Sequence, residues 1–449
     1  MSIPTFKEYA EENFTLCEKR IPDELYKKYN VYRGLRDENG KGVMAGITNV
    51  STIYGKKVVD GKEIPADGIL LYRGYALQDL VKGQSLKEHR LSEECAYLLL
   101  FGELPTRAQL DEFTKVLANG RTLPTNFNRD VIMKAPSGDV MNSIIRSVLT
   151  LASYDKDALD NSLDNVLRQS LMLISTMPML AVYAYHACNH YIKGGSLIIH
   201  RPDPELTWAE NLLMMLRPDK QFTELEARVL DLALVLQMEH GGGNNSTFTT
   251  HVVTSTGSDT YSTIAAALAS LKGPKHGGAN LKVVGMMDDI KRHVRDIRDE
   301  DEVAAYLGKI LDGEAFDHAG LIYGLGHAVY SLSDPRFLVF ESFVENLAKE
   351  KGMSSEYALY KSVEKLGQNL ICERRKIFKG VCPNVDFLSG FEYRMLDIPD
   401  EMFTPIFAIG RIAGWSAHRM EELYNNRKII RPAFKSIMDE RPYIQLNDR

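Results

Sequence analysis

The chain has few cysteines for its length, and their spacing excludes two kinds of small structural site. Only five occur in 449 residues, and no pair has the CxxC spacing typical of zinc knuckles and redox motifs. An odd number without that spacing favours reduced thiols in a cytoplasmic protein over a disulfide framework. These cysteines are Cys17, Cys95, Cys188, Cys372 and Cys382.

Long runs of one charge sign and long apolar runs are also missing. The formal net charge is −6, which argues against nucleic acid or an anionic membrane as the main partner. The most apolar stretch, Leu171 to Ala187, is interrupted by polar residues and Pro178. It is short for a membrane span, so we expect a buried core helix. The polar, acidic N-terminus has neither the apolar core of a signal peptide nor the basic character of a transit peptide.

What the sequence does contain is typical of a large, mainly α-helical enzyme. Hydrophobic residues make up 44% and charged residues 25%, and the length allows two domains. Residues 43–73 predict short strands, with a tight turn at Asp60-Gly61. The first 30 residues predict a polar helical segment, and most of the chain after residue 75 has helical periodicity. The predicted helices cover about 76–82, 89–102, 106–119, 137–154, 158–192, 205–216, 224–240 and 258–273.

Four segments place histidine, aspartate or arginine in loops rich in glycine or proline. Glycine beside a histidine lets the backbone approach a ligand and leaves the ring accessible. One such histidine is more often a turn residue or a hydrogen-bonded core residue, but three of them, with an aspartate and an arginine, favour an active site. The segments are Glu239–Asn244, Gly273–Asn280, Gly324–Arg336 and Pro383–Asp386.

These segments resemble the motifs of the citrate synthase family. GLGHAVYSLSDPR resembles its signature, GPKHGGAN its first catalytic-histidine loop and PNVDFLSG its catalytic-aspartate loop. FTPIFAIGRIAGWSAHRMEE and IIRPAF resemble its C-terminal arginine segments, and the motifs follow in family order over about residues 35–435. The resemblance implies a mainly α, two-domain citrate synthase fold with a small N-terminal β region. It implies a large domain of 1–276, a small domain of 277–389, and a return of 390–449 to the large domain as an inter-subunit arm.

The resemblance also implies a reaction and its catalytic residues. Acetyl-CoA, oxaloacetate and water would give citrate and CoA, the acyl group becoming an alkyl group on transfer in a si-type enzyme of the tricarboxylic acid cycle. Asp386 would remove the α-proton of the thioester, and desolvation would raise its basicity. His276 would donate, as a neutral imidazole, to the enolate oxygen. His327 would donate to the ketone oxygen of oxaloacetate.

Substrate carboxylates require cations, and the family pattern supplies them. The planar guanidinium fork pairs with a carboxylate through two parallel hydrogen bonds. Arg336 and Arg411 match the substrate arginines, and Arg431 matches an arginine that enters from the partner subunit, which implies a homodimer with a shared site. His240 and Asn244 complete the implied substrate-binding set.

CoA is implied as a co-substrate, with no tightly bound cofactor and no metal. Leu321, Gly324, Leu325 and Gly326 belong to the segment that resembles the adenine-binding loop. Relatives often carry a basic residue four positions after His327, where this chain has Ser331, and a solvated basic face is an equal alternative for each phosphate-binding candidate. These candidates are Arg374 and Lys376, with Lys275, Arg375 and Lys379 as further ones.

Other functions remain to be weighed against this reading. A 2-methylcitrate synthase using propionyl-CoA, or an enzyme of dual specificity, is the main alternative, because one methylene changes binding by only ~1–3 kcal/mol. A metal-dependent hydrolase would be inhibited by a chelator and would not need the arginine motifs. His186 and His190 have a spacing that could hold a metal on one helical face, but their apolar neighbours favour packing. A catalytically silent homologue would be expected to lack one of the three catalytic residues.

Overall fold

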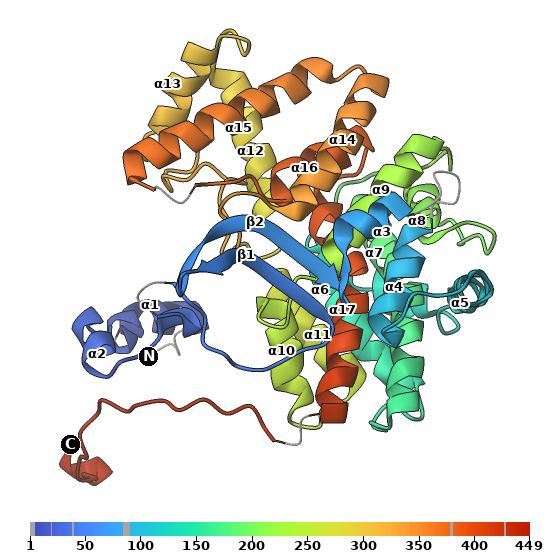
Figure 1. Ribbon diagram of the computed structural model, residues 1–449. Coiled ribbons are helices and arrows are strands. Elements are labelled where there is room, and N and C mark those ends of the chain that lie inside the picture. The colour runs from blue at the N-terminus through green and yellow to red at the C-terminus, as the bar shows by residue number, and fades with distance from the viewer. Residues whose placement is uncertain (1–4, 19, 38–39, 84–89, 378–379, 426–427) are drawn as a thin grey trace. The chain divides into compact units, whose positions relative to one another are not determined.

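The computed structural model describes residues 5–18, 20–37, 40–83, 90–377, 380–425 and 428–449 (Figure 1). It consists of 58% helix and 6% strand, so the predicted mainly α class is confirmed. The chain divides into two compact units, one comprising Met1–Ile47 with Arg431–Arg449 and the other Thr48–Ile430.

The first unit contains the predicted N-terminal helices. They are α1 (Phe6–Cys17) and α2 (Asp23–Lys28), followed by the 3₁₀ turn η1 (Arg33–Leu35). Thr5 and Glu8 form a reciprocal capping box at the start of α1, which satisfies backbone N–H groups that the first turn leaves without partners. The described C-terminal segment, residues 428–449, contains no helix or strand other than the 3₁₀ turn η5 (Leu446–Asp448).

The second unit begins with an antiparallel sheet of three strands. Its strands are β1 (Ser51–Val59), β2 (Lys62–Tyr72) and β3 (Tyr75–Ala76). The predicted turn is confirmed, since Asp60 and Gly61 join β1 to β2 with φ of 50° and 75°. Tyr54 pairs with Ile69 and Lys56 with Pro65, so Ala66, Asp67 and Gly68 of β2 lie opposite Gly55 alone and β2 bulges there.

Helices form the body of the second unit, and α17 (Phe403–Asn425) is buried along most of its length. It packs against α4 (Leu91–Phe101), α7 (Leu163–Tyr191), α9 (Glu224–Met238), α10 (Asn245–Thr254) and α11 (Thr260–Leu271) (Figure 1). The remaining helices of this body are α3 (Leu77–Gly83), α5 (Arg107–Asn119), α6 (Val140–Leu151) and α8 (Trp208–Leu216), with the short turns η2 (Asn128–Met133), η3 (Ala152–Tyr154) and η4 (Asp400–Met402).

Helix α7 contains the most apolar stretch of the sequence. Its length and composition would allow it to cross a membrane, but most of its apolar window is buried in the protein, as predicted for a core helix. His186 Nε2 lies 3.2 Å from the carbonyl oxygen of Met215, and His190 Nδ1 lies 2.9 Å from that of Gly195. Each histidine of the pair therefore has a backbone partner, in agreement with the packing role favoured by the sequence.

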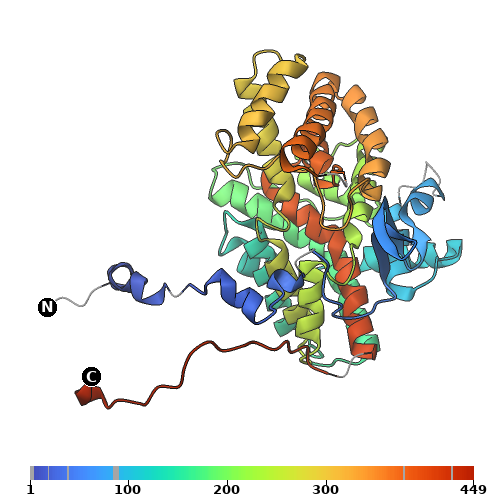
Figure 2. The same cartoon turned by 60° about the vertical axis from the view of Figure 1, so that its left-hand side comes forward.

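Five further helices pack mainly on one another at one side of the second unit (Figures 1 and 2). They are α12 (Ala279–His293), α13 (Glu300–Leu311), α14 (Pro335–Glu350), α15 (Ser354–Arg375) and α16 (Asp386–Met395). Helix α14 also contacts α9, α3 and β2 of the helical body. The predicted boundary at residue 389 falls inside α16, and the division into a large and a small domain stays a prediction.

Candidate functional site

The turn between α9 and α10 positions His240 in a tightly packed environment. Gly241 follows with φ of 83°, and a Cβ at this position would lie 2.4 Å from Ile53 Cδ1. Only glycine fits this backbone conformation and space without strain. His240 is buried, and burial together with Arg336 lowers its pKa well below the ordinary value. The ring is therefore neutral at physiological pH.

The loop after Gly326 fixes the tautomer of His327. Its Nδ1 accepts the backbone N–H groups of Val329 at 3.1 Å and Tyr330 at 3.2 Å. A ring nitrogen that accepts a hydrogen bond carries no proton, so the proton of the neutral ring lies on Nε2. The His327 and His240 ring centroids are 5.0 Å apart, with the rings at 83°. His327 is thus held as an Nε2 donor beside His240.

Backbone pairing joins the His327 loop to the Asp386 loop. Leu325 and Pro383 form an antiparallel bridge, and Gly326 N donates to the Cys382 carbonyl at 2.7 Å. Asn384 N donates to the Gly324 carbonyl at 2.9 Å. A Cβ on Gly324 would lie 2.7 Å from Phe387 Cδ2, so this glycine permits the close approach. Two motifs almost 60 residues apart in sequence are therefore neighbours in the fold.

Asp386 is the first residue of α16 and has an unusually basic carboxylate. Burial raises its pKa to about 6, although Arg336 and Arg411 oppose the shift. The backbone N–H of Asp386 donates to Asn384 Oδ1 at 3.0 Å, which holds the start of the helix in place. A carboxylate with this pKa is ionised at neutral pH and is a better proton acceptor than an exposed aspartate.

His276 lies between α11 and α12, and Ser246 is its hydrogen-bond partner. His276 Nε2 is 3.0 Å from Ser246 Oγ, which also receives Trp415 Nε1–H at 3.2 Å and lies 3.0 Å from Asn244 Oδ1. Burial and the charge of Arg411 lower the pKa of His276 to about 4. The ring is neutral at pH 7, as the predicted donor role requires.

Arg336 is buried and already ion-paired. Its Nη2 and Nε donate to Asp334 Oδ2 at 2.7 Å and Oδ1 at 3.1 Å. Asp334 caps α14 by accepting the backbone N–H of Arg336, so the pair is tied to a helix start. Burial alone would lower the pKa of Arg336, but the Asp334 carboxylate keeps it above the ordinary value. The guanidinium is consequently a permanent, rigidly held cation.

Arg411, on α17, is fully buried with part of its guanidinium unused. Nε donates to the carbonyl of Gln237, while Nη1 has no partner among the described residues. Burial lowers its pKa to about 10, so it is still charged at pH 7. His240 Nε2 is likewise buried without a partner in the described part of the chain. Unpaired buried polar atoms are costly, and an anionic ligand with carboxylate oxygens would satisfy the Arg411 donor.

A buried hydrogen-bond network around Glu239, next to His240 in the sequence, was not found from the sequence. Glu239 Oε1 accepts His418 Nε2–H at 3.0 Å and Ser51 Oγ–H at 2.8 Å. Against the effect of burial, His418 and Arg411 lower the pKa of Glu239 to about 2. His418 Nδ1 lies 3.1 Å from His251 Nε2, which continues the network. These residues surround the segment that carries His240, and their partners are too distant in sequence for a local motif to reveal them.

Comparison with known proteins shows the family of this chain. The family model described as "Citrate synthase, C-terminal domain" matches residues 35–433. The chain belongs to the citrate synthase family. A citrate synthase of Synechocystis sp. is 35% identical over 395 residues, covering 87% of this chain and 90% of the relative. A 2-methylcitrate synthase of Corynebacterium glutamicum is 32% identical over 415 residues, covering 91% and 97%.

Solved structures of the citrate synthase family share the fold. The enzyme of Pyrobaculum aerophilum superposes with a TM-score of 0.73 at 30% identity, covering 92% of this chain and 95% of that one. The enzyme of Thermoplasma acidophilum, solved as a ternary complex with carboxymethyl coenzyme A and oxaloacetate, gives a TM-score of 0.75 at 27% identity. That comparison covers 93% of this chain and 99% of the solved chain. The predicted family and fold are thereby confirmed.

The residues predicted to contact CoA differ in how they are engaged. Gly324 and Gly326 have φ of 80° and 93° and form the bridge to the Asp386 loop, together with Leu325. Leu321 is exposed, as is Lys376 at the end of α15. Arg374 is ion-paired with Asp312 and donates to the Gly308 carbonyl at 3.1 Å. A phosphate would compete with Asp312 for Arg374.

The structure does not test two further candidates, the substrate-binding Arg431 and the phosphate-binding Lys379. Arg431 is exposed and belongs to the first unit, so its contribution to a neighbouring subunit's site stays a prediction. Lys379 lies outside the described residues.

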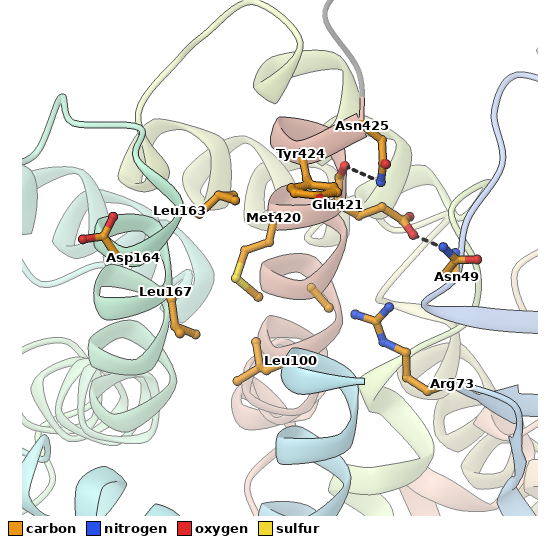
Figure 3. A pocket seen from close by; sticks show the side chains of 11 residues that line it. Asn49, Arg73, Leu100, Leu163, Asp164, Leu167, Met420, Glu421, Tyr424 and Asn425 are labelled. Atoms are coloured by element: carbon orange, nitrogen blue, oxygen red, sulfur yellow. Dashed lines mark hydrogen bonds between the residues drawn. The ribbon is translucent and has the colours of Figure 1, made fainter. Parts of the chain in front are cut away.

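A pocket of about 450 Å³ lies in the second unit (Figure 3). Its lining includes Arg73, Leu167, Met420, Glu421 and Tyr424, and Glu421 Oε1 accepts the backbone N–H of Asn49 at 2.6 Å. The lining contains none of the predicted site residues, so this pocket is separate from the candidate active site.

Proposed function

We propose that this protein condenses acetyl-CoA with oxaloacetate and water to give citrate and CoA. Membership of the citrate synthase family supports a condensation of this type. The observation that carries the proposal is that one site combines three features. The carboxylate of Asp386 has a raised pKa, His327 donates from Nε2, and two buried arginines, Arg336 and Arg411, act on Asp386. A base, a donor and cations for an anionic substrate are what the reaction requires.

Asp386 is the proposed base in the first step. It removes a proton from the methyl carbon of the thioester, and the electron pair moves toward the thioester oxygen. His276 donates a hydrogen bond to that oxygen as the enolate forms. A neutral imidazole donates from Nδ1 when Ser246 gives its hydroxyl proton to Nε2, and the 3.0 Å contact allows this orientation. Asn244 Oδ1 competes for the same hydroxyl proton, so Asn244 influences the tautomer of His276.

His327 and the arginines act on oxaloacetate in the next step. His327 donates from Nε2 to the ketone oxygen and polarises the carbon that the enolate attacks. Arg336, Arg411 and His240 bind the carboxylates. The carbon–carbon bond forms, the ketone oxygen takes up a proton, and water then hydrolyses the thioester to release CoA. Oxaloacetate binds first, and movement of the small domain then closes the site and protects the thioester from hydrolysis.

The second candidate is condensation of propionyl-CoA to 2-methylcitrate. It is favoured by the similarity to the enzymes of that name in Corynebacterium glutamicum and Shewanella oneidensis, at 32% and 33% identity. A pocket that accepts one extra methylene loses only ~1–3 kcal/mol of discrimination. Dual specificity is therefore physically easy.

A panel of acyl-CoA substrates tests these alternatives directly. Free CoA thiol is measured with acetyl-, propionyl- and butyryl-CoA, with and without oxaloacetate and with and without a chelator. We expect release that depends on oxaloacetate, is fastest with acetyl-CoA and is unaffected by the chelator. Faster release with propionyl-CoA would establish the second candidate instead. Release that stops with the chelator would contradict both.

Arg431 provides a test of the proposed homodimer. Because Arg431 would enter the neighbouring subunit's site, Arg431→Ala and Asp386→Asn chains should each have only a small residual activity alone. A heterodimer of the two contains one site with both residues intact, so unfolding and re-annealing a mixture should restore part of the activity. Two Arg431→Ala preparations mixed together are the control. A mixed sample with heterodimers but no gain in activity would contradict the shared site.

The proposal also includes the residues that contact CoA and a cytoplasmic location of the protein. The segment Leu321–Gly326 would contact the adenine, with Lys376 and Arg374 near the phosphates. No tightly bound cofactor is required for the condensation. The four cysteine side chains that the structure describes are free thiols, which supports a cytoplasmic location.

A further inference from the structure

The β1–β2 hairpin contacts two of the histidine-bearing loops of the site, those of His240 and His327. On the His240 side, Ser51 Oγ donates to Glu239 Oε1 at 2.8 Å. On the His327 side, Gly68 N donates to the Ser333 carbonyl at 3.1 Å, and Ser333 Oγ donates to Asp67 Oδ1 at 2.9 Å. The hairpin therefore contacts two loops whose histidines, His240 and His327, are 87 residues apart in the sequence.

The hairpin is irregular at the place where the His327 loop rests. Tyr54 pairs with Ile69 and Lys56 pairs with Pro65, so the register breaks around Gly55 and Gly68. A Cβ on Gly55 would lie 2.8 Å from the Val329 carbonyl oxygen and 3.3 Å from Tyr330 Cδ1. A Cβ on Gly68 would lie 2.3 Å from the Ser333 carbonyl oxygen and 2.6 Å from Tyr330 Cδ1. The bulge and its two glycines thus leave a space that the Tyr330 ring fills.

Tyr330 in turn contacts both histidines. Its ring is stacked on that of His327, with centroids 4.8 Å apart and an interplanar angle of 19°. It meets the His240 ring edge-on at 5.6 Å and 86°. The side chain is buried, and its hydroxyl donates only a long hydrogen bond, 3.4 Å, to the Ile69 carbonyl. The main contact of Tyr330 with the two histidines is therefore made by its ring and not by its hydroxyl.

We propose that Tyr330, held by the glycine-lined bulge of the hairpin, is a positioning residue for His327. The backbone N–H groups of Val329 and Tyr330 hold Nδ1, but they leave the ring able to tilt about that nitrogen. A flat surface stacked on one face of the imidazole prevents the tilt and keeps Nε2 directed at the substrate. Since a misplacement of about 1 Å can cost roughly 10²-fold in rate, this restraint matters for the chemical step. The inference rests on the role of His327 in the proposed function.

Substitutions at position 330 separate positioning from simple packing. Tyr330→Phe keeps the stacked ring and loses only the long hydroxyl contact, so kcat should stay within about 3-fold of wild type. Tyr330→Leu and Tyr330→Met fill the space without a flat ring and should lower kcat by up to roughly 10²-fold. The KM for oxaloacetate should change much less than kcat, because the arginines remain. Circular dichroism and thermal unfolding identify a variant that has not folded.

A second pair of variants tests whether the space beside Gly68 is needed to hold the Tyr330 ring. Gly68→Ala places a methyl group against Ser333 and Tyr330 and should lower kcat in the same way. Gly138→Ala is the matched control, because a Cβ there meets nothing within 4 Å. Wild-type kcat in folded Tyr330→Leu or Tyr330→Met would overturn the inference. An equal loss in Tyr330→Phe would also overturn it, because the hydroxyl would then be the important group.

Crystallography gives a readout that does not depend on turnover. In Tyr330→Phe the His327 imidazole should occupy one position, whereas in Tyr330→Met it should be tilted or in more than one orientation. An unchanged, singly ordered imidazole in Tyr330→Met would refute positioning even if no acyl-CoA were turned over. Failure of the wild-type protein to release CoA with any acyl-CoA would instead refute the proposed function.

Discussion

Replacing Asp386 with asparagine should lower kcat roughly 10²–10⁴-fold while oxaloacetate still binds. Asparagine has nearly the same shape but cannot accept the α-proton, so enolisation loses its base. The buried arginines that would bind oxaloacetate are unaffected by this change. Turnover is measured as CoA thiol release with saturating substrates, and oxaloacetate affinity is measured by calorimetry. Near-wild-type turnover in the variant would show that another group is the base.

The pH dependence of the wild type is part of the same prediction. Burial raises the pKa of Asp386 to about 6, and the base works only when it is ionised. Activity should therefore be full above this pKa and should fall as the pH decreases through about 6. An ordinary aspartate would place this fall near pH 4. The residual activity of Asp386→Asn should lack this acidic limb, and a wild-type limb near pH 4 would contradict the assigned environment.

Asp397→Asn is a suitable control for the substitution. Asp397 is exposed and has φ of 56°, a conformation that asparagine also adopts readily. Asp397→Asn thus makes the same chemical change as Asp386→Asn, the loss of one carboxylate, but at a position outside the candidate site. We expect wild-type kcat and an unchanged pH profile. A comparable loss in this control would indicate an effect of charge or preparation and not of the base.

Local signals in the sequence were sufficient for much of the fold. The helix predicted from about residue 224 starts there, and a capping box of Thr223 and Glu226 explains its start. The predicted helix at 158–192 begins only at Leu163, because side chains compete with the backbone before it. Asp160 Oδ1 accepts the Ser162 N–H at 2.9 Å, and Asn165 Nδ2 donates to the Asp160 carbonyl at 2.7 Å. Periodicity alone does not show such local hydrogen bonds.

Sequence motifs named the candidate site residues, but they did not reveal the residues that hold those side chains in place. Family resemblance named His276, His327 and Asp386 because each stands in a compact motif. Ser246, which contacts His276 from 30 residues away, has no such motif. Tyr330 lies within the signature segment, yet its stacking depends on a bulge in a hairpin more than 250 residues earlier. Contacts of this kind arise from tertiary packing, so only the structure reveals them.

Arg411→Leu should strongly weaken the response to oxaloacetate while leaving the free protein folded. Nη1 of Arg411 is buried without a partner among the described residues, so a substrate carboxylate is its expected partner. Removing one member of a buried, hydrogen-bonded charge pair costs about 2–5 kcal/mol, a loss in affinity of roughly 30- to 4,000-fold. Arg411→Lys keeps the charge but loses the planar fork, and should give an intermediate affinity.

Thermal unfolding measures this loss without catalysis. Oxaloacetate at 100 times its Kd should stabilise the wild type by about 2.7 kcal/mol. After a 30-fold or larger loss of affinity, the same concentration should stabilise Arg411→Leu by at most about 0.9 kcal/mol, so its increase in Tm should be a third of the wild-type value or less. A full ligand-induced increase in Tm would show that Arg411 does not bind the substrate.

Arg419, two turns later on α17, provides a control with the opposite outcome. It is also fully buried, but its donors bond neutral oxygens, including Thr263 Oγ1 at 2.9 Å and Asn161 Oδ1 at 2.7 Å. Arg419→Leu leaves these oxygens without donors, at a cost of about 1–3 kcal/mol for each. It should lower Tm of the free protein yet keep the stabilisation by oxaloacetate. Two buried arginines on one helix would then be separated by experiment, Arg411 acting on the ligand and Arg419 on the fold.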